Sequence, residues 1–231
     1  MPKSPLQIPA SSLEFLKSLK LNNNREWFND HKDEFLEQQA YIETFAEGLI
    51  AELNTQDVIE TLSGKKSLSR IYRDTRFSKE KIPYKHYFNG HFSRSGRHRR
   101  GGYYFRIEPG NTFIAGGFQN PNAEDLKRIR EEIAADPSAL NKIVLGKPFR
   151  ETFGTLRGEQ LKTTPKGFDR DHEAIALLRY KQFLLVRSFT DEEVLSASFV
   201  KDAAQVYKRM LPFFDYMSEI LSTDINGAGI S

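Results

Sequence analysis

Apolar side chains recur every three or four residues along the first fifty positions, which is the spacing of amphipathic helices. Ser11 and Glu14 have the spacing of a capping box, so the pattern predicts a short helix that begins there. The asparagines at 22–24 break this helix and can cap the next one, which is predicted from Arg25 to Leu53. The apolar stripe of this long helix consists of Phe28, Phe35, Ile42, Phe45, Leu49 and Leu53.

Alternating apolar and polar positions replace the helical spacing in the middle of the chain, where they predict strands. Pro83 removes a backbone donor and restricts Ile82, so 77–84 is predicted as a loop. A β-hairpin is predicted around the turn at 108–111, and the pair Gly116 and Gly117 predicts a bulge or a close backbone approach. The predicted strands are Leu68–Arg73, Tyr87–Phe92, Tyr103–Glu108 and Thr112–Phe118.

Helical spacing returns after Pro121 and dominates the C-terminal part of the chain. A final long helix is predicted from Ser198 to Leu221, with a kink at Pro212. The other elements predicted here are a helix over 123–134, a short helix at Pro137, a helix over 171–181 and a strand over 183–189.

The order of these elements predicts an α+β fold. Strands cluster in the middle and helices lie at both ends, which favours an antiparallel sheet of about four to six strands flanked by long N- and C-terminal helices. No internal repeat and no long linker is visible, so one domain is predicted over 1–231. It comprises N-terminal helices at about 11–53, a basic strand-rich centre at about 65–118 and a C-terminal helical part at about 122–222.

The composition is that of a globular protein without disulfides. The 231 residues contain no cysteine, and 12% of them are aromatic. Absence of cysteine excludes thiolate metal sites and fits a reducing compartment. No stretch resembles a secretory signal or a membrane span, so we expect a cytoplasmic protein that does not bind membranes.

The net charge of +3 conceals a strongly basic segment. Residues 65–106 contain 13 Lys or Arg and only two acids, Asp74 and Glu80, whereas the rest of the chain has more acids than bases. A local positive field attracts anions, so this segment is the predicted site.

Residues 70–84, which we call the signature, have the sequence RIYRDTRFSKEKIPY. Arginines recur every third residue, and their planar donors suit phosphate or carboxylate. The predicted anion clamp consists of Arg70, Arg73, Asp74, Arg76, Lys81, Tyr84 and Lys85, with His86, Arg99, Arg100 and Arg106 as secondary candidates.

Asp74 is an acid surrounded by bases, so it is expected to have a lowered pKa and to orient arginine side chains. An alternative remains open, in which Asp74 ties two arginines into a buried network that closes the sheet. Near the start of the long helix, Arg25 and Glu26 are expected to form a surface pair and Trp27 to join the core. The alternative there is that this element faces the same pocket as the signature.

The signature also resembles a family catalogued as domain of unknown function 2461, which comprises bacterial proteins of about this length. The pattern R-x-x-R-D-x-R-F-x-x-x-K-x-P-Y is matched without departure. The resemblance extends to NNNREWF at 22–28, GYYFRIEPG at 102–110 and PKGFDRDH at 165–172. It implies a single-domain protein and directs attention to the signature, but it implies no activity or substrate.

Motifs for cofactors and for covalent catalysis are absent from the sequence. There is no G-x-G-x-x-G, Walker or G-x-S-x-G pattern, and no cofactor is predicted. His86, His91 and His98 lie in the basic segment, but the five-residue spacing of the first two puts them on opposite faces of a regular strand. A metal site is therefore not predicted, and whether the protein is an enzyme stays open.

Three functions are compatible with these patterns. The first is a pocket for a phosphorylated or otherwise anionic small molecule, with possible turnover and with Tyr84 as one wall. The second is a nucleic-acid-binding module in which Tyr72, Tyr103 or Tyr104 stacks on bases. The third is an interaction protein in which the signature is architectural and each arginine is buried against an acid. The oligomeric state is not predicted.

Overall fold

The computed structural model describes residues 6–74, 76, 82–96 and 100–222. Contacts between backbone positions divide the chain into two compact units. Unit 1 comprises 1–93, 104–114 and 188–205, and unit 2 comprises 94–103, 115–187 and 206–231. The prediction of a single domain over 1–231 stays a prediction. No helix in the described ranges is both long enough and apolar enough to span a membrane.

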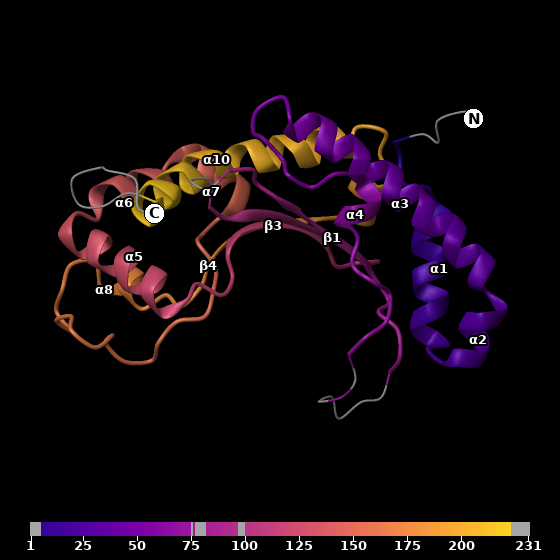
Figure 1. Cartoon of the computed structure of the whole chain (residues 1–231), viewed down its shortest axis with the longest axis horizontal. Helices are drawn as coiled ribbons and strands as arrows, with labels where there is room; N and C mark the ends of the chain where they lie inside the picture. The colour runs from indigo at the N-terminus through magenta and orange to yellow at the C-terminus, as the bar shows by residue number, and fades with distance from the viewer. Residues whose placement is uncertain (1–5, 75, 77–81, 97–99, 223–231) are drawn as a thin grey trace. The chain divides into compact units, whose positions relative to one another are not determined.

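The four strands of the described residues form one antiparallel sheet in the order β1-β2-β3-β4. Figure 1 shows this sheet in the centre of the view. The strands are β1 (Phe88–Ser93), β2 (Gly102–Ile107), β3 (Thr112–Phe118) and β4 (Phe183–Phe189). Buried positions alternate along β1, β2 and β3, so these strands bury one face and leave the other half-exposed. The predicted α+β fold is therefore confirmed, with a sheet at the lower end of the expected size.

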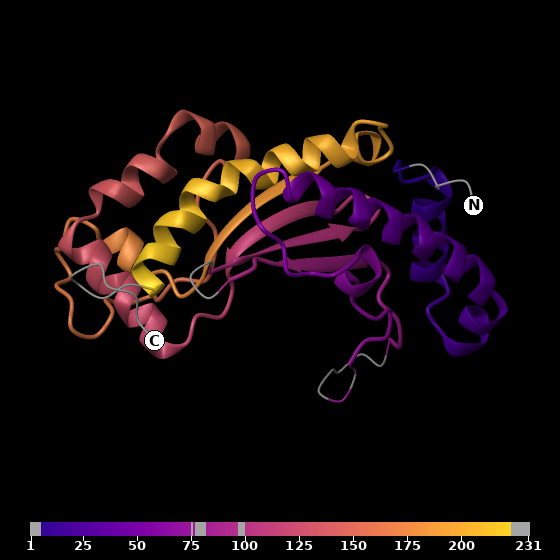
Figure 2. The same ribbon diagram turned by 45° about the horizontal axis from the view of Figure 1, so that its top comes forward.

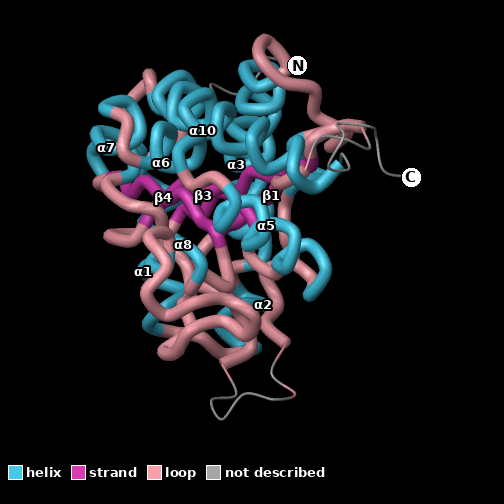
Figure 3. Tube along the Cα trace, turned by 90° about the vertical axis from the view of Figure 1, so that its left-hand side faces the viewer, coloured by secondary structure: helices cyan, strands magenta, loops and turns pink. Residues whose placement is uncertain are grey.

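Unit 1 buries its sheet face under the long helix α3 (Lys32–Leu53), which lies on one side of β1 in Figures 1 and 3. Phe45 of this helix packs edge-on against Phe105 of β2 at 5.6 Å between ring centroids. Phe45 also stacks on Phe199, the first residue of α10 (Phe199–Ser222), at 5.1 Å. Phe92 of β1 joins the same cluster, with its ring centroid 5.7 Å from that of Phe105. Such aromatic pairs stabilise a core beyond the area they bury.

Two helices precede α3 in unit 1, and their boundaries correct the predictions. The first is α1 (Ala10–Leu21), whose N-cap is Pro9, so Ser11 lies inside the first turn and no side chain caps the helix. The predicted capping box is therefore wrong. The predicted helix from Arg25 to Leu53 is divided into α2 (Arg25–Asp30) and α3, because the backbone of His31 leaves the helical region. The cap at Asn24 is confirmed, since its side chain accepts from the Trp27 amide.

Unit 2 has its own aromatic core. Tyr103 is 1% exposed and packs edge-on against Tyr207 and Phe214 at 4.9 and 5.1 Å between centroids. Its helices are α5 (Ala123–Ala135), α6 (Ser138–Val144), α7 (Lys147–Phe153) and α8 (Ile175–Leu178). The first of these was predicted closely and α7 was missed.

The predicted helix over 171–181 shrinks to the single turn of α8. Residues 179–181 instead pair with the backbone of 159–161, through Leu161 N donating to Arg179 O and Lys181 N donating to Glu159 O, both near 2.8 Å. Two short helices in unit 1 complete the fold, α4 (Gly64–Ser67) and α9 (Asp191–Val194), and α9 carries a capping box between Thr190 and Glu193.

The close backbone approach predicted at the glycine pair is confirmed. Gly117 has a φ of +134°, and a Cβ atom there would lie 2.1 Å from the Phe183 carbonyl oxygen. A Cβ atom at Gly116 would lie 2.5 Å from the sulfur of Met210. These glycines let β3 approach β4 and the helix that covers it, which no larger residue allows without a shift.

We expect Gly117→Ala to lower the free energy of unfolding by more than about 2 kcal/mol, since it combines backbone strain with a clash. Gly154→Ala is the matched control in the same unit, because Gly154 also has a positive φ but no described atom lies within 4 Å of its Cβ position. It should cost only about 1–2 kcal/mol of strain. Urea unfolding of both variants measures the difference, and equal losses would contradict the predicted clash.

Candidate functional site

The two ends of the signature lie side by side as a short antiparallel pair next to the sheet edge (Figure 2). Arg73 N donates to Pro83 O at 2.9 Å, and Lys85 N donates to Ile71 O at 2.8 Å. The segment joins β1 through Ser69 N, which donates to Asn89 O at 2.9 Å. The predicted strand over 68–73 thus forms isolated bridges and not a regular strand. Most of the predicted loop at 77–84 falls outside the described residues.

Asn23 holds this pair against the N-terminal helices. Its side-chain amide donates to the Tyr84 carbonyl at 3.0 Å and accepts from the Tyr84 amide at 3.1 Å. The ring of Tyr84, which is 4% exposed, stacks on Phe28 of α2 at 4.0 Å between centroids. An asparagine side chain therefore takes the place of a neighbouring strand and aligns α2 with the signature.

A cavity of about 310 Å³ opens where α2 meets the signature, and we call it the clamp cavity. The α2 residues Arg25 and Asn29 lie four positions apart, so they share one face of the helix. The residues that line the cavity are Arg25, Asn29, Tyr72, Arg73, Pro83 and Tyr84.

The two arginines that line the clamp cavity have no acidic partner in the described part of the chain, so we expect the cavity to attract anions. Among the described residues, no carboxylate lies within 4.0 Å of the Arg25 or Arg73 guanidinium. Burial raises the pKa of the Tyr84 phenol, as does the neighbouring Tyr72, while the charge of Arg25 opposes the shift. Tyr84 therefore stays protonated at neutral pH and can donate a hydrogen bond.

Asp74 pairs with Arg76 and not with the other arginines of the signature. The Arg76 guanidinium donates to both carboxylate oxygens, the shorter contact being 2.7 Å. This side-chain bond, together with the Arg76 backbone amide, holds the pKa of Asp74 below its usual value. Both side chains are exposed, at 79% for Arg76 and 57% for Asp74. The predicted lowering of the Asp74 pKa is confirmed, while the alternative of a buried network is wrong.

The remaining members of the predicted clamp are distributed around the cavity. Arg70 is exposed and lines a second hollow of about 170 Å³ together with Lys65. Lys81 and the secondary candidate Arg99 fall outside the described residues. Lys85 is not among the residues that line the clamp cavity.

Lys85 belongs to a network on the half-exposed face of the sheet. Its ammonium donates to the Arg70 carbonyl at 2.7 Å, and burial followed by the charge of Arg106 lowers its pKa. The Arg106 guanidinium lies 3.9 Å from the ring centre of Tyr87 and 5.2 Å from that of Phe113. These are cation–π distances, so Arg106 is held largely by protein groups.

The tyrosines proposed as stacking platforms differ in accessibility. Tyr72 is 61% exposed and lines the clamp cavity. Tyr104 is half-buried, and burial raises the pKa of its phenol, while interactions with Arg106 and Asn89 oppose that shift. Tyr103 is buried in the core of unit 2, so its expected role in stacking is wrong.

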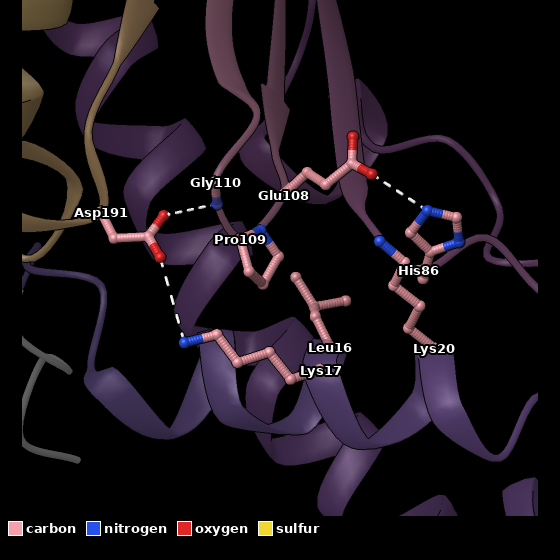
Figure 4. Close-up of a pocket in the computed structure, with 8 residues that line it drawn as sticks. All are labelled: Leu16, Lys17, Lys20, His86, Glu108, Pro109, Gly110 and Asp191. Carbon is pink, nitrogen blue, oxygen red and sulfur yellow. Dashed lines mark hydrogen bonds and ion pairs between the residues drawn. The ribbon is translucent and has the colours of Figure 1, made fainter.

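A third hollow of about 280 Å³, drawn in Figure 4, contains paired charges of both signs. His86 Nε2 lies 3.0 Å from a Glu108 oxygen, and the Asp191 carboxylate accepts from Gly110 N at 2.8 Å. Lys17 extends toward Asp191, with 4.0 Å between nitrogen and oxygen, while Lys20 points toward the space beside Glu108. These contacts tie the β2–β3 turn to α1 and α9, so the secondary candidate His86 has a structural partner.

Arg100 lies in unit 2, where its guanidinium pairs with Asp125 and its backbone amide donates to Ser218 at 2.9 Å. His91 is exposed and His98 falls outside the described residues. Within the described part of the chain, no three His, Asp or Glu side chains gather as metal ligands would.

The predictions missed Asn29 as a member of the site and considered Arg25 only in an alternative. Arg25 and Glu26 were expected to form a surface pair, but no ion pair joins them, and Arg25 lines the clamp cavity. Trp27 is half-buried and stacks on His31 at 4.0 Å between centroids. The alternative in which this element faces the signature pocket is the one the structure supports. The spacing of Arg25 and Asn29 on one helical face was the available signal.

Comparison with known proteins gives one match. The family model described as "Conserved hypothetical protein (DUF2461)" matches residues 11–216 of the chain. This range includes every residue that lines the clamp cavity. No curated protein and no solved structure matches the chain.

We expect Asn23→Ala to lower the free energy of unfolding by about 1–3 kcal/mol, because it leaves two backbone groups of Tyr84 without partners. Asn22→Ala is the control, since Asn22 makes one exposed bond to Ser18 O. It should change stability by less than about 0.5 kcal/mol. Urea denaturation measures both, and a loss at Asn22 as large as at Asn23 would show that Asn23 has no special role.

Proposed function

The chain belongs to the DUF2461 family of conserved hypothetical proteins, and we propose that it binds a phosphorylated or otherwise anionic small molecule in the clamp cavity. One observation carries this proposal. Two arginines from distant parts of the chain, Arg25 and Arg73, line one cavity, and no acid is among the described residues of its walls. Like charges in a shared site repel each other, and an anion bound between them removes that cost.

The chemistry of the lining supports an oxyanion ligand. Guanidinium groups present several donors in a plane, which matches the oxygens of phosphate and carboxylate. The Asn29 amide and the protonated Tyr84 phenol can supply further donors. A volume of about 310 Å³ lies at the lower end of the ~300–1,000 Å³ range of ligand pockets, so a small metabolite fits.

The protein scaffold around these donors is rigid where the ligand would contact it. Tyr84 is held by its stack on Phe28 and by both hydrogen bonds from Asn23. Arg73 is anchored by its backbone bond to Pro83. Such preorganisation lowers the entropic cost of binding.

We expect Arg25→Ala and Arg73→Ala each to weaken the binding of pyrophosphate by about 10- to 100-fold. This is the effect of losing one charged hydrogen-bonding partner. Isothermal titration calorimetry measures the affinities. Arg76→Ala is the matched control, because it removes a signature cation that Asp74 already pairs. Its effect should be less than about threefold, as for an exposed ion pair. Equal weakening by all three variants would indicate a diffuse field instead of a site.

A second prediction separates binding from an architectural role of the signature. Without ligand, Arg73→Ala should melt within about 2 °C of the wild type, because its guanidinium has no acidic partner to lose. Differential scanning calorimetry of the ligand-free proteins tests this. A melting temperature lowered by 10 °C or more would assign Arg73 to the maintenance of the fold and contradict the proposed function.

A further inference from the structure

Tyr72 is a large aromatic side chain that the fold leaves exposed at the mouth of the clamp cavity. It is 61% exposed, whereas the neighbouring Tyr84 is 4% exposed. Both tyrosines line the cavity, and they face each other across the antiparallel bridge that closes the signature. Burying an aromatic ring is favourable, so an exposed ring that lines a cavity is available for contact with a ligand bound there.

The ring of Tyr72 is supported from one side by other rings. Its centroid lies 5.4 Å from that of Tyr84, with the planes tilted by 47°. Phe28 meets it edge-on at 6.4 Å, and Phe28 itself stacks on Tyr84. This three-ring cluster fixes the position of Tyr72 while most of its surface stays open to solvent.

We propose that the ligand of the clamp cavity is a nucleotide, free or within a single strand, whose base stacks on Tyr72 and whose phosphate lies between Arg25 and Arg73. This inference rests on the proposed function and names its ligand class. A planar aromatic base has the shape that an exposed tyrosine ring accepts, and every base has a π-face for stacking. The adjacent arginines supply the donors that the phosphate requires.

The charges along the signature also indicate where a further phosphate would lie. Arg70 precedes Arg73 by three residues, a separation of at most about 10 Å along extended backbone. Arg70 is exposed, and no described carboxylate lies within 4.0 Å of its guanidinium. A diphosphate or the next phosphate of a strand could therefore extend from Arg73 toward Arg70, whereas Asp74 and Arg76 already form a pair.

Titrations with four probes test the inference on the full-length protein. The probes are pyrophosphate, adenosine, ADP and a single-stranded hexadeoxythymidylate, and isothermal titration calorimetry measures the affinity of each. We expect ADP to bind at least tenfold more tightly than pyrophosphate, because its base stacks on Tyr72 while its phosphates bind the arginines. Adenosine, which has no phosphate, should bind weakly.

Variants of Tyr72 separate the contribution of base stacking to the affinity from that of the arginines. Tyr72→Leu should weaken the binding of ADP about tenfold and change the affinity for pyrophosphate by less than about twofold. Tyr72→Phe, which keeps the aromatic ring, should bind ADP with the affinity of the wild type. Tyr72 is exposed, so these substitutions are compatible with folding, which unchanged melting temperatures would verify.

The outcomes are distinct. If pyrophosphate binds and ADP binds no better, or if Tyr72→Leu weakens both probes equally, the nucleotide inference is overturned while the proposed function stands. If none of the four probes binds, both fail. If the hexanucleotide binds more tightly than ADP and loses affinity steeply with salt, the nucleotide is part of a strand, since phosphate contacts release counterions. If ADP is preferred, the ligand is a free nucleotide.

Discussion

The candidate site depends on the contact between Asn23 and Tyr84. One amide side chain satisfies both backbone polar groups of a residue whose ring is buried on Phe28. Buried backbone groups must find partners, so this contact specifies where α2 lies relative to the signature. The register follows from it, because a shift of one residue would turn Tyr84 outward and Lys85 inward. The proximity of Arg25 and Arg73 is a consequence of that alignment.

The ion pairs of the described residues show which arginines of the basic segment are neutralised by an acid. Several of its arginines have partners among the described residues: Arg76 with Asp74, Arg94 with Asp215, Arg100 with Asp125 and Arg106 with Glu108. Arg70 and Arg73 have no carboxylate within 4.0 Å in the described structure. These two arginines lie next to the sheet edge in unit 1, where Arg25 lines the clamp cavity together with Arg73. A field of this kind acts over about 10 Å at moderate salt, so it favours anions at that edge.

Local patterns in the sequence predicted the elements that depend on local forces. The hairpin around 108–111, the helix at 123–135 and the glycine pair at 116–117 follow from turn chemistry and periodicity. Errors arose where distant residues compete for the same groups. Residues 179–181 leave the predicted helix to pair with the backbone of 159–161. The placement of Arg25 in the site was only an alternative for the same reason, since Arg73 follows 48 positions later in the chain.

Tyr84 and Lys85 are adjacent in the chain, but their side chains lie in two chemically different surroundings. Tyr84 turns toward α2 and the clamp cavity, while Lys85 turns toward Arg106 and the half-exposed sheet face. On the sheet face the cations are held by carbonyl, carboxylate and aromatic groups of the protein, so little of their attraction is left for a ligand. Among the described residues of the clamp cavity, the arginines have aromatic rings beside them but no acids. An arginine that is not paired with an acid remains free to bind phosphate, and an exposed aromatic ring remains free to stack on a planar base. The two arginines and Tyr72 together therefore say more about the ligand than the number of basic residues does.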